Sequence, residues 1–313
     1  MAEHQTAGDS LSYKIVTYVV QGRDRAGIVI DAKIFDAEKL SGKPEYGTVP
    51  GILADWDAAD ASFAGRSGKV PQEDGIPLES AVLKAPLCPG QIYGAGGNYQ
   101  DHISGAQKVG MGSVDPKAVG ERPWFFVQSS RNAVVGQDAV IPIPENEARL
   151  DWEIELALII GREAFKVSAA DARDYVAGYA VSNDLSARGY AIRSGFDPGK
   201  PMYWDWYSQK CFDGSCPLGP WIVPARYVSD PQSLDMKLWV DGELMQNSNT
   251  RNMIFPIGEL IEEATARTTL YPGDVILTGT PSGTGLESAT FIKPGSKLRL
   301  FISEIGELRH SFV

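Results

Sequence analysis

The chain has 313 residues, of which 43% are hydrophobic and 22% charged, so it is long enough for about two domains and can bury a sizeable core. Its 40 acidic residues outnumber its 29 lysines and arginines, and the formal net charge of −11 argues against nucleic acids and anionic membrane surfaces as partners. Only three histidines and three cysteines are present, which excludes a His-rich metal site and favours neither a disulfide framework nor a zinc site.

The N-terminal segment indicates the expected compartment and the first elements. The opening MAEHQTAGDS lacks the basic and apolar regions of a signal peptide, and no apolar run approaches the roughly 18 residues of a membrane span, so we expect a cytoplasmic protein. Residues 1–12 are typical of a disordered tail, and strands are expected at Tyr13–Val20 and Ala26–Ile30. The polar stretch Gly65–Pro77 predicts a linker or a long surface loop, with a domain boundary near residue 80.

Beyond residue 80 the chain consists of short apolar runs separated by proline and glycine. This pattern predicts a β-rich α+β fold, with domains over residues 1–80 and 81–313. Helices are expected at Ala169–Val176, with Ser168 as N-cap, and at Phe255–Thr268, where apolar residues share one face. The C-terminal third predicts strands at residues 235–240 (before an Asp-Gly hairpin turn), 275–278 and 297–303.

A glycine-rich segment, residues 94–102 (GAGGNYQDH), follows a short predicted strand. It is not a dinucleotide-binding fingerprint, because Tyr99 stands where the third glycine would fall. We expect the glycines to let the backbone approach a ligand, with Asn98, Tyr99 and His102 presented from the loop. Any acid–base chemistry by histidine falls to His102, and a surface histidine in a polar loop is the alternative.

The segment DWEIELALII, residues 151–160, alternates with period two. Glu153 and Glu155 therefore share one face of the predicted strand with Asp151 and Ala157, and the apolar continuation argues against full solvation. Neighbouring buried carboxylates are costly unless a cation lies between them, and a hard divalent ion such as Mg²⁺, Mn²⁺ or Ca²⁺ meets that need. The alternative is a solvent-facing acidic stripe on an edge strand, and the pattern alone leaves both open.

Later segments offer one more carboxylate, two cations and a polar loop. Asp184, after the apolar run 179–183, could complete an oxygen set, although alone it would be read as a turn former or helix cap. Arg188 could bind a substrate carboxylate, and Lys210 could bind an oxyanion or simply lie on the surface. The loop TGTPSGTG, residues 278–285, lacks the features of a P-loop or a nucleophile elbow, so it suits hydrogen bonds to carboxylate or carbonyl oxygens.

Seven motifs in sequence resemble those of the fumarylacetoacetate hydrolase family, across roughly residues 85–313. They are GxGxNYxDH, DWEIEL, GYAVSNDLSAR, QKCFDGSCPLGPW, DGELMQ, LYPGDVILTGTPSGTG and FIKPGSKL. Residues 1–80 resemble the variable N-terminal domain of bacterial members. The resemblance implies a mixed β-sandwich roll that forms homodimers. It also implies Mg²⁺ or Mn²⁺ as the cofactor, with Ca²⁺ able to occupy the site in crystals, bound by Glu153, Glu155 and Asp184.

The resemblance also implies a reaction on β-diketo or 2-oxo acids. In such a mechanism the metal chelates two substrate oxygens and stabilises an enolate, His102 activates water, and Lys210 stabilises the developing oxyanion. The expected substrate-binding residues are Arg188, Thr280, Asn98 and Tyr99. The implied function is hydrolysis of a C–C bond in a small anionic acid resembling an acylpyruvate or fumarylpyruvate, in the catabolism of aromatic compounds or sugars.

The chain departs from the family pattern in the acid–base half of the site. Many small members carry glutamate three residues after the histidine, and the two form a His–Glu dyad. This chain has Gly105 at that position, so Glu121 and Glu287 are the candidates for the missing acid. The glycine-rich stretch 105–121 is consistent with a mobile lid. Phe126-Val-Gln128 replaces the Phe-x-Lys of many relatives, which removes a positive charge.

Two other functions stay open from sequence. The first is a 2-oxo acid decarboxylase of the oxaloacetate type, or an isomerase or hydratase, on the same metal site. The absence of a glutamate at position 105 favours this first alternative, because decarboxylation needs no activated water. The second is a non-catalytic family member that kept the fold and the metal.

Overall fold

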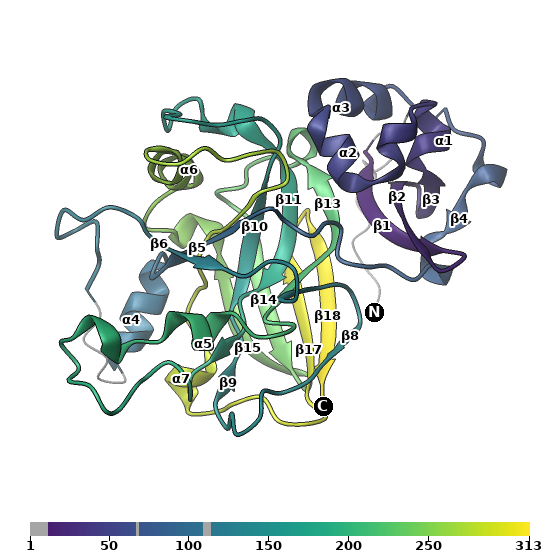
Figure 1. Ribbon diagram of the computed structural model, residues 1–313. Coiled ribbons are helices and arrows are strands. Elements are labelled where there is room, and N and C mark those ends of the chain that lie inside the picture. The colour runs from purple at the N-terminus through teal and green to yellow at the C-terminus, as the bar shows by residue number, and fades with distance from the viewer. Residues whose placement is uncertain (1–11, 67–68, 109–113) are drawn as a thin grey trace.

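The apolar runs of the chain pair into one large mixed sheet in the computed structural model, which describes residues 12–66, 69–108 and 114–313 (Figure 1). The strand order is β4-β3-β2-β1-β13-β11-β10-β16-β5-β6, and β7 pairs with β13 away from this path. The strands are β1 (Lys14–Val20), β2 (Arg23–Ile30), β3 (Lys33–Asp36), β4 (Ile76–Pro77), β5 (Ile92–Gly96), β6 (Trp124–Gln128), β7 (Val134–Val135), β10 (Ile154–Ile160), β11 (Val176–Asn183), β13 (Cys216–Pro224) and β16 (Val275–Leu277).

A second, five-stranded sheet, in the order β15-β14-β17-β18-β8, packs against the first. Its strands are β8 (Ala139–Ile141), β14 (Asp235–Val240), β15 (Glu243–Asn249), β17 (Lys297–Ile302) and β18 (Gly306–Phe312). The predicted Asp-Gly hairpin is confirmed, since Asp241 and Gly242 both have positive φ (51° and 90°) between β14 and β15. A short ladder pairs β9 (Leu150–Asp151) with β12 (Ser186–Ala187).

The helices of the described residues are short and lie around the sheets. They are α1 (Ala37–Ser41), α2 (Val49–Ala54), α3 (Trp56–Ala64), α4 (Gln100–Lys108), α5 (Trp206–Lys210), α6 (Ile257–Thr265) and α7 (Gly285–Ser288). The predicted helix at Phe255–Thr268 is confirmed in its core, because α6 buries Ile257, Leu260 and Ile261 on one face. The predicted helix at Ala169–Val176 is wrong: only one 3₁₀ turn forms there (Ala172–Tyr175), since Val176 is recruited into β11.

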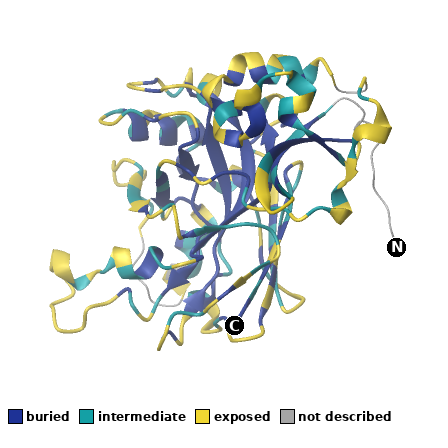
Figure 2. Ribbon diagram, turned by 45° about the vertical axis from the view of Figure 1, so that its right-hand side comes forward, coloured by how far each residue is buried: buried dark blue, intermediate teal, exposed yellow. Residues whose placement is uncertain are grey.

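Strand β10 lies in the interior of the large sheet, and all of its residues are buried. Buried residues are concentrated in the central strands of the molecule (Figure 2). Leu156 and Leu158 of β10 join the core between the two sheets, whereas Ala157 and Ile159 join a second core beneath the N-terminal helices α2 and α3. This double burial explains the unbroken apolar run of the segment. Mixed sheets with peripheral helices confirm the predicted β-rich α+β class.

The N-terminal strands extend the large sheet through hydrogen bonds between β1 and β13 (Figure 1). The stretch predicted as a linker, Gly65–Pro77, contains β4, which pairs with β3, and a 3₁₀ turn at Gln72–Asp74; residues 67 and 68 lie outside the described part. The expected tail, residues 1–12, also lies outside it apart from residue 12. The domain boundary near residue 80 stays a prediction. No helix of the described residues is long and apolar enough to cross a membrane.

Folding holds His310 on β18 uncharged in the interior. The Asn183 Oδ1 accepts the Glu153 N–H, so the Asn183 Nδ2 donates to His310 Nε2 at 2.9 Å and the proton lies on Nδ1. That Nδ1 has no hydrogen-bond partner among the described residues. Burial without a counter-charge lowers the pKa of His310 to about 3.

This buried histidine predicts a loss of stability in mild acid. An unfolded histidine titrates near 6.5, so between that pH and about 3 the unfolded chain binds a proton that the folded chain does not, and stability falls as pH falls. Between pH 7 and pH 5 the unfolding free energy should fall by roughly 2 kcal/mol more in the wild type than in His310→Gln. Urea denaturation of both proteins at the two pH values measures this; parallel pH profiles would contradict it.

Candidate metal and acid–base site

Three buried carboxylates converge where β10 and β11 leave the large sheet. The antiparallel register places Ile154 opposite Asn183, and the Asp184 N–H donates to the Glu153 carbonyl at 2.9 Å. One oxygen each from Glu153, Glu155 and Asp184 can be chosen so that all lie within 4.8 Å of one another. Because β10 is an interior strand and all three side chains are buried, the alternative of a solvent-facing stripe does not hold.

Two cations contact this cluster. Lys210, at the end of α5, places its Nζ 2.6 Å from Glu153 Oε2 and 2.5 Å from Asp184 Oδ2. Arg188 contacts Glu153 Oε1 through Nη2 at 2.5 Å and Asp151 Oδ2 through Nε at 3.0 Å. Together with Asp151, the cluster contains four buried carboxylates, whereas only two cations contact them. With all groups ionised, two negative charges are left uncompensated in the interior. A divalent cation supplies the missing charge, and carboxylate oxygens are the donors that Mg²⁺ and Mn²⁺ prefer.

The three acids differ in how closely cations contact them, and their pKa values differ accordingly. Burial alone would raise the pKa of Glu153, but the adjacent Lys210 and Arg188 charges outweigh it and lower the pKa to about 2. Burial raises the pKa of Asp184 to about 6, because Lys210 only partly opposes burial and the Glu153 charge. Burial and the charges of Asp184 and Glu153 raise the pKa of Glu155 well above its usual range. Glu155 is thus the acid whose ionisation most needs an added cation.

Asp151 is a site residue whose role the sequence did not assign. It is fully buried, accepts the Gly285 N–H at 2.6 Å and the Leu286 N–H at 3.1 Å, and holds the Arg188 guanidinium. Its carboxylate therefore joins Arg188 to the start of α7. The available signal was its place in the same period-two stripe as Glu153 and Glu155.

His102 lines the same cavity as the carboxylate cluster and pairs with Glu287. The structure corrects the predicted loop, because His102 is on the first turn of α4. Its Nδ1 lies 3.1 Å from Glu287 Oε1, while Glu121 is exposed on the surface. Although burial would raise the pKa of Glu287, hydrogen bonds from His102 and from the Gly283 N–H lower it, so the acid is ionised at neutral pH. An ionised partner at Nδ1 leaves Nε2 of a neutral imidazole able to accept a proton.

Gly105 provides the space that Glu287 fills. A Cβ at position 105 would lie 2.3 Å from Glu287 Oε2, closer than side chains tolerate. Position 105 lies three residues after His102 on α4, and so on the same helix face. The Glu287 carboxylate, which enters from α7, therefore occupies the space beside the imidazole into which a side chain at position 105 would extend.

The loop after β16 closes the site through backbone hydrogen bonds. The Gly279 N–H donates to Glu155 Oε2 at 2.6 Å, and Thr280, which lines the cavity, donates its hydroxyl to the Ile154 carbonyl. Gln246 of β15, a residue with no predicted role, donates to Thr280 Oγ1 and accepts the Ile154 N–H. The loop is therefore fixed to β10 beside the acids.

Asn98 and Tyr99 lie in the protein interior and do not line the cavity. The Asn98 amide donates to the Phe255 and Thr278 carbonyls and accepts the Phe255 N–H. The Tyr99 hydroxyl contacts Met236 Sδ, and the ring is fully buried. Both side chains make contacts that hold the fold together, so they are not part of the substrate site proposed below.

These groups open into a cavity of about 410 Å³, a size suited to a small molecule. His102, Glu153, Glu155, Asp184, Arg188, Lys210 and Thr280 form its polar end, and Trp124, Phe126 and Trp206 are among its apolar residues. Of the stretch predicted as a lid, 105–121, residues 109–113 lie outside the described part of the chain.

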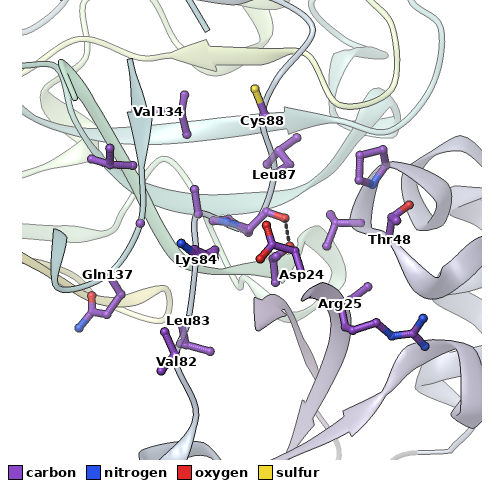
Figure 3. A pocket seen from close by; sticks show the side chains of 18 of the residues that line it. Asp24, Arg25, Thr48, Val82, Leu83, Lys84, Leu87, Cys88, Val134 and Gln137 are labelled. Atoms are coloured by element: carbon purple, nitrogen blue, oxygen red, sulfur yellow. Dashed lines mark hydrogen bonds between the residues drawn. The ribbon is translucent and has the colours of Figure 1, made fainter. Parts of the chain in front are cut away.

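A larger cavity, about 650 Å³, lies between residues of β2 and α2 near the N-terminus and the segment from Val82 to Cys88 (Figure 3). Its Arg25 is already paired with Asp36 and Glu38, and the Thr17 hydroxyl donates to the Pro86 carbonyl. The described residues around it bring together no group of acids, bases or nucleophiles comparable with the smaller cavity. We therefore place the chemistry in the smaller one.

Comparison with known proteins gives the chain a family context. Residues 91–313 match the model of the fumarylacetoacetate (FAA) hydrolase C-terminal domain. A Burkholderia multivorans protein whose name specifies only a hydrolase is 36% identical over 301 residues, which are 94% of this chain and 96% of that protein.

Similar solved structures that cover nearly the whole chain include two whose names specify an activity. Maleylpyruvate hydrolase from Sphingobium sp. SYK-6, in complex with a manganese(II) ion and pyruvate, is 29% identical, with a TM-score of 0.73 over 96% of this chain and 98% of that one. The 5-carboxymethyl-2-hydroxymuconate delta-isomerase from Mycobacterium smegmatis is 28% identical, with a TM-score of 0.70 over 96% and 98%. The similar structures thus include both a hydrolase and an isomerase.

Proposed function

Since the chain belongs to the fumarylacetoacetate hydrolase family, whose enzymes act on small organic acids, we propose that it hydrolyses a C–C bond of a β-diketo acid of the acylpyruvate type. The proposed catalytic residues are His102 and Lys210, and Arg188 and Thr280 are proposed to bind the substrate. The observation that carries hydrolysis is the pairing of His102 with Glu287, because His102 lines the same cavity as the carboxylates.

We assign Glu153, Glu155 and Asp184 as the ligands of a divalent cation, Mg²⁺ or Mn²⁺. Support comes from their convergence within 4.8 Å and from the two uncompensated negative charges around them. A manganese ion is present in the maleylpyruvate hydrolase structure. When bound, the ion would polarise the oxo groups of the substrate as a Lewis acid.

The protein side chains divide the remaining work. Arg188, held by Asp151, supplies positive charge for the substrate carboxylate, and Lys210 stabilises negative charge that develops on a substrate oxygen. His102 takes a proton from water through Nε2, and Glu287 stabilises the imidazolium that forms. After attack on the distal carbonyl, the C–C bond breaks to give an organic acid and, after protonation, pyruvate.

The His102–Glu287 pair weighs against the decarboxylase considered above. The sequence favoured a decarboxylase because no glutamate follows His102 by three residues. Glu287 lies beside the His102 imidazole, so an acid is present there after all. An isomerase remains the natural competitor, because the delta-isomerase from Mycobacterium smegmatis has the same fold. Homodimer formation, cytoplasmic location and a role in aromatic catabolism stay predictions.

Pyruvate release from acylpyruvates tests the proposed function. Purified protein supplied with Mg²⁺ or Mn²⁺ should convert acetylpyruvate to equimolar acetate and pyruvate, with loss of the enol absorbance. Chelator should stop the reaction, and returned metal should restore it. Shifted enol absorbance without pyruvate would indicate an isomerase, CO₂ release from oxaloacetate a decarboxylase, and inertness toward a wide 2-oxo acid panel a non-catalytic protein; each would contradict hydrolysis.

A further inference from the structure

Three aromatic rings form one wall of the site cavity. The centroids of Trp124 and Trp206 lie 4.8 Å apart, and Phe126 and Trp206 stack at 6.0 Å with 19° between their planes. Trp124 and Trp206 keep 45% and 38% of their surface exposed, a large apolar area to leave in water. Lys210 Nζ lies 5.3 Å from the centre of the Phe126 ring, so this aromatic wall begins directly beside the carboxylate cluster.

The wall is held in place by the β5–β6 pairing. In that register Gly94 lies opposite Phe126 and Gly96 opposite Trp124. A Cβ on Gly94 would lie 2.3 Å from the Phe126 ring, and one on Gly96 2.4 Å from the Trp124 ring, so each ring lies against bare backbone. These two glycines make room for the rings of the wall. Gly96 also lines the cavity, so the expected approach of this backbone to a ligand stays a prediction. Trp206 comes from α5, which is N-capped by Asp205.

The charges of the cavity restrict what can lie against this wall. The only cationic side chains among the described residues that line the cavity are Arg188 and Lys210, and both contact the carboxylate cluster. Besides the three rings, the lining includes the apolar residues Ala95, Ile103, Val114 and Pro116. A second carboxylate at this end would lose its hydration without gaining a cation, which is unfavourable.

We propose that the acyl group of the substrate is aromatic, so that the substrate is a monoanionic aroylpyruvate and not a dicarboxylate such as fumarylpyruvate. The proposal rests on the proposed function, because the pyruvyl end must lie at the carboxylate cluster. The ring of the substrate then lies against Trp124, Phe126 and Trp206, where offset-stacked or edge-to-face contacts favour it. This assignment narrows the sequence-based expectation, which included fumarylpyruvate-like acids.

Specificity constants test the proposal. With Mg²⁺ present, kcat/KM for benzoylpyruvate should exceed kcat/KM for fumarylpyruvate by roughly tenfold or more. Equal values, or a preference for fumarylpyruvate, would overturn it. If acetylpyruvate, benzoylpyruvate and fumarylpyruvate are all left intact, it is the proposed function that fails. In that case, calorimetric titration of the Mg²⁺-loaded protein still tests whether the aromatic wall binds an aromatic acyl group. Benzoylpyruvate should bind more tightly than fumarylpyruvate, and equal or weaker binding would contradict the proposal.

A variant of the wall and a neighbouring control identify the residues responsible. Trp206→Leu keeps an apolar side chain but removes the ring, so kcat/KM for benzoylpyruvate should fall roughly tenfold more than kcat/KM for acetylpyruvate, mainly through KM. Tyr207→Leu is the control, because Tyr207 is the next residue on α5, is 73% exposed and does not line the cavity. Equal losses on both substrates in Trp206→Leu, or the same selective loss in Tyr207→Leu, would refute the aromatic wall.

Discussion

Replacing Glu155 with glutamine is expected to lower cation-dependent activity by a factor of at least about 10³ while leaving the cation-free fold intact. The amide loses the negative charge that the cation requires but can still accept the Gly279 N–H that Glu155 accepts at 2.6 Å. Glu155 has no ion-pair partner among the described residues and lies near two like charges. Its neutral isostere should therefore change the unfolding free energy by no more than about 1 kcal/mol.

Glu153→Gln is the matched control for this variant. Glu153 pairs with both Lys210 and Arg188, so glutamine at this position removes one of the two carboxylate partners of each cation, while Asp184 and Asp151 remain. This loss should cost about 1.5–3 kcal/mol of stability, more than the change at Glu155. Both variants should lose activity and the thermal stabilisation that Mg²⁺ or Mn²⁺ gives the wild type. Denaturation in chelator and melting curves with added metal provide the measurements. Full activity in chelator-treated Glu155→Gln, or an unchanged metal-induced rise in Tm, would remove Glu155 from the assigned ligands.

The His102–Glu287 pair predicts the second large effect. His102→Gln should lower kcat/KM by roughly 10²–10⁴-fold, because it removes the proposed base. Glu287→Ala should lower it by roughly 10–100-fold, since the imidazole keeps its place but loses the carboxylate that orients it. Steady-state kinetics on acetylpyruvate measures both. A loss below tenfold in His102→Gln would favour an isomerase or a decarboxylase.

Gly105 allows the acid to be moved to the helix. In the Glu287→Ala background the space beside position 105 is empty, so an added Gly105→Glu should recover at least about tenfold of the lost activity. Gly105→Glu alone should lose activity, because its Cβ would meet Glu287 Oε2 at 2.3 Å and the two carboxylates would repel each other. Circular dichroism verifies folding in each variant. No recovery in a folded double variant would contradict the view that the two positions are equivalent.

The local sequence pattern predicted an element correctly where the burial of its residues alternates regularly along the chain or where a turn needs particular residues. The period-two alternation of residues 151–160 predicted one strand, which is confirmed over Ile154–Ile160 and interrupted at residues 152 and 153, after β9. The Asp-Gly pair at 241–242 correctly predicted a hairpin. The pattern failed at Ala169–Val176, where pairing with β10 and β13 took Val176 into a strand. Local helix signals in so short a segment cannot outweigh a buried ladder of hydrogen bonds.

By itself, the sequence determined the strand content, the family and the closely spaced acids Glu153 and Glu155 at the start of β10, because side-chain alternation along an extended segment is a local property. Only the tertiary structure decided which acid meets His102, since Glu287 is 185 residues away and either of two glutamates was possible. The same holds for Asp151 beside Arg188 and for the wall built from β6 and α5. Such contacts arise when elements distant in sequence pack together, and the periodicity of one element does not contain that information.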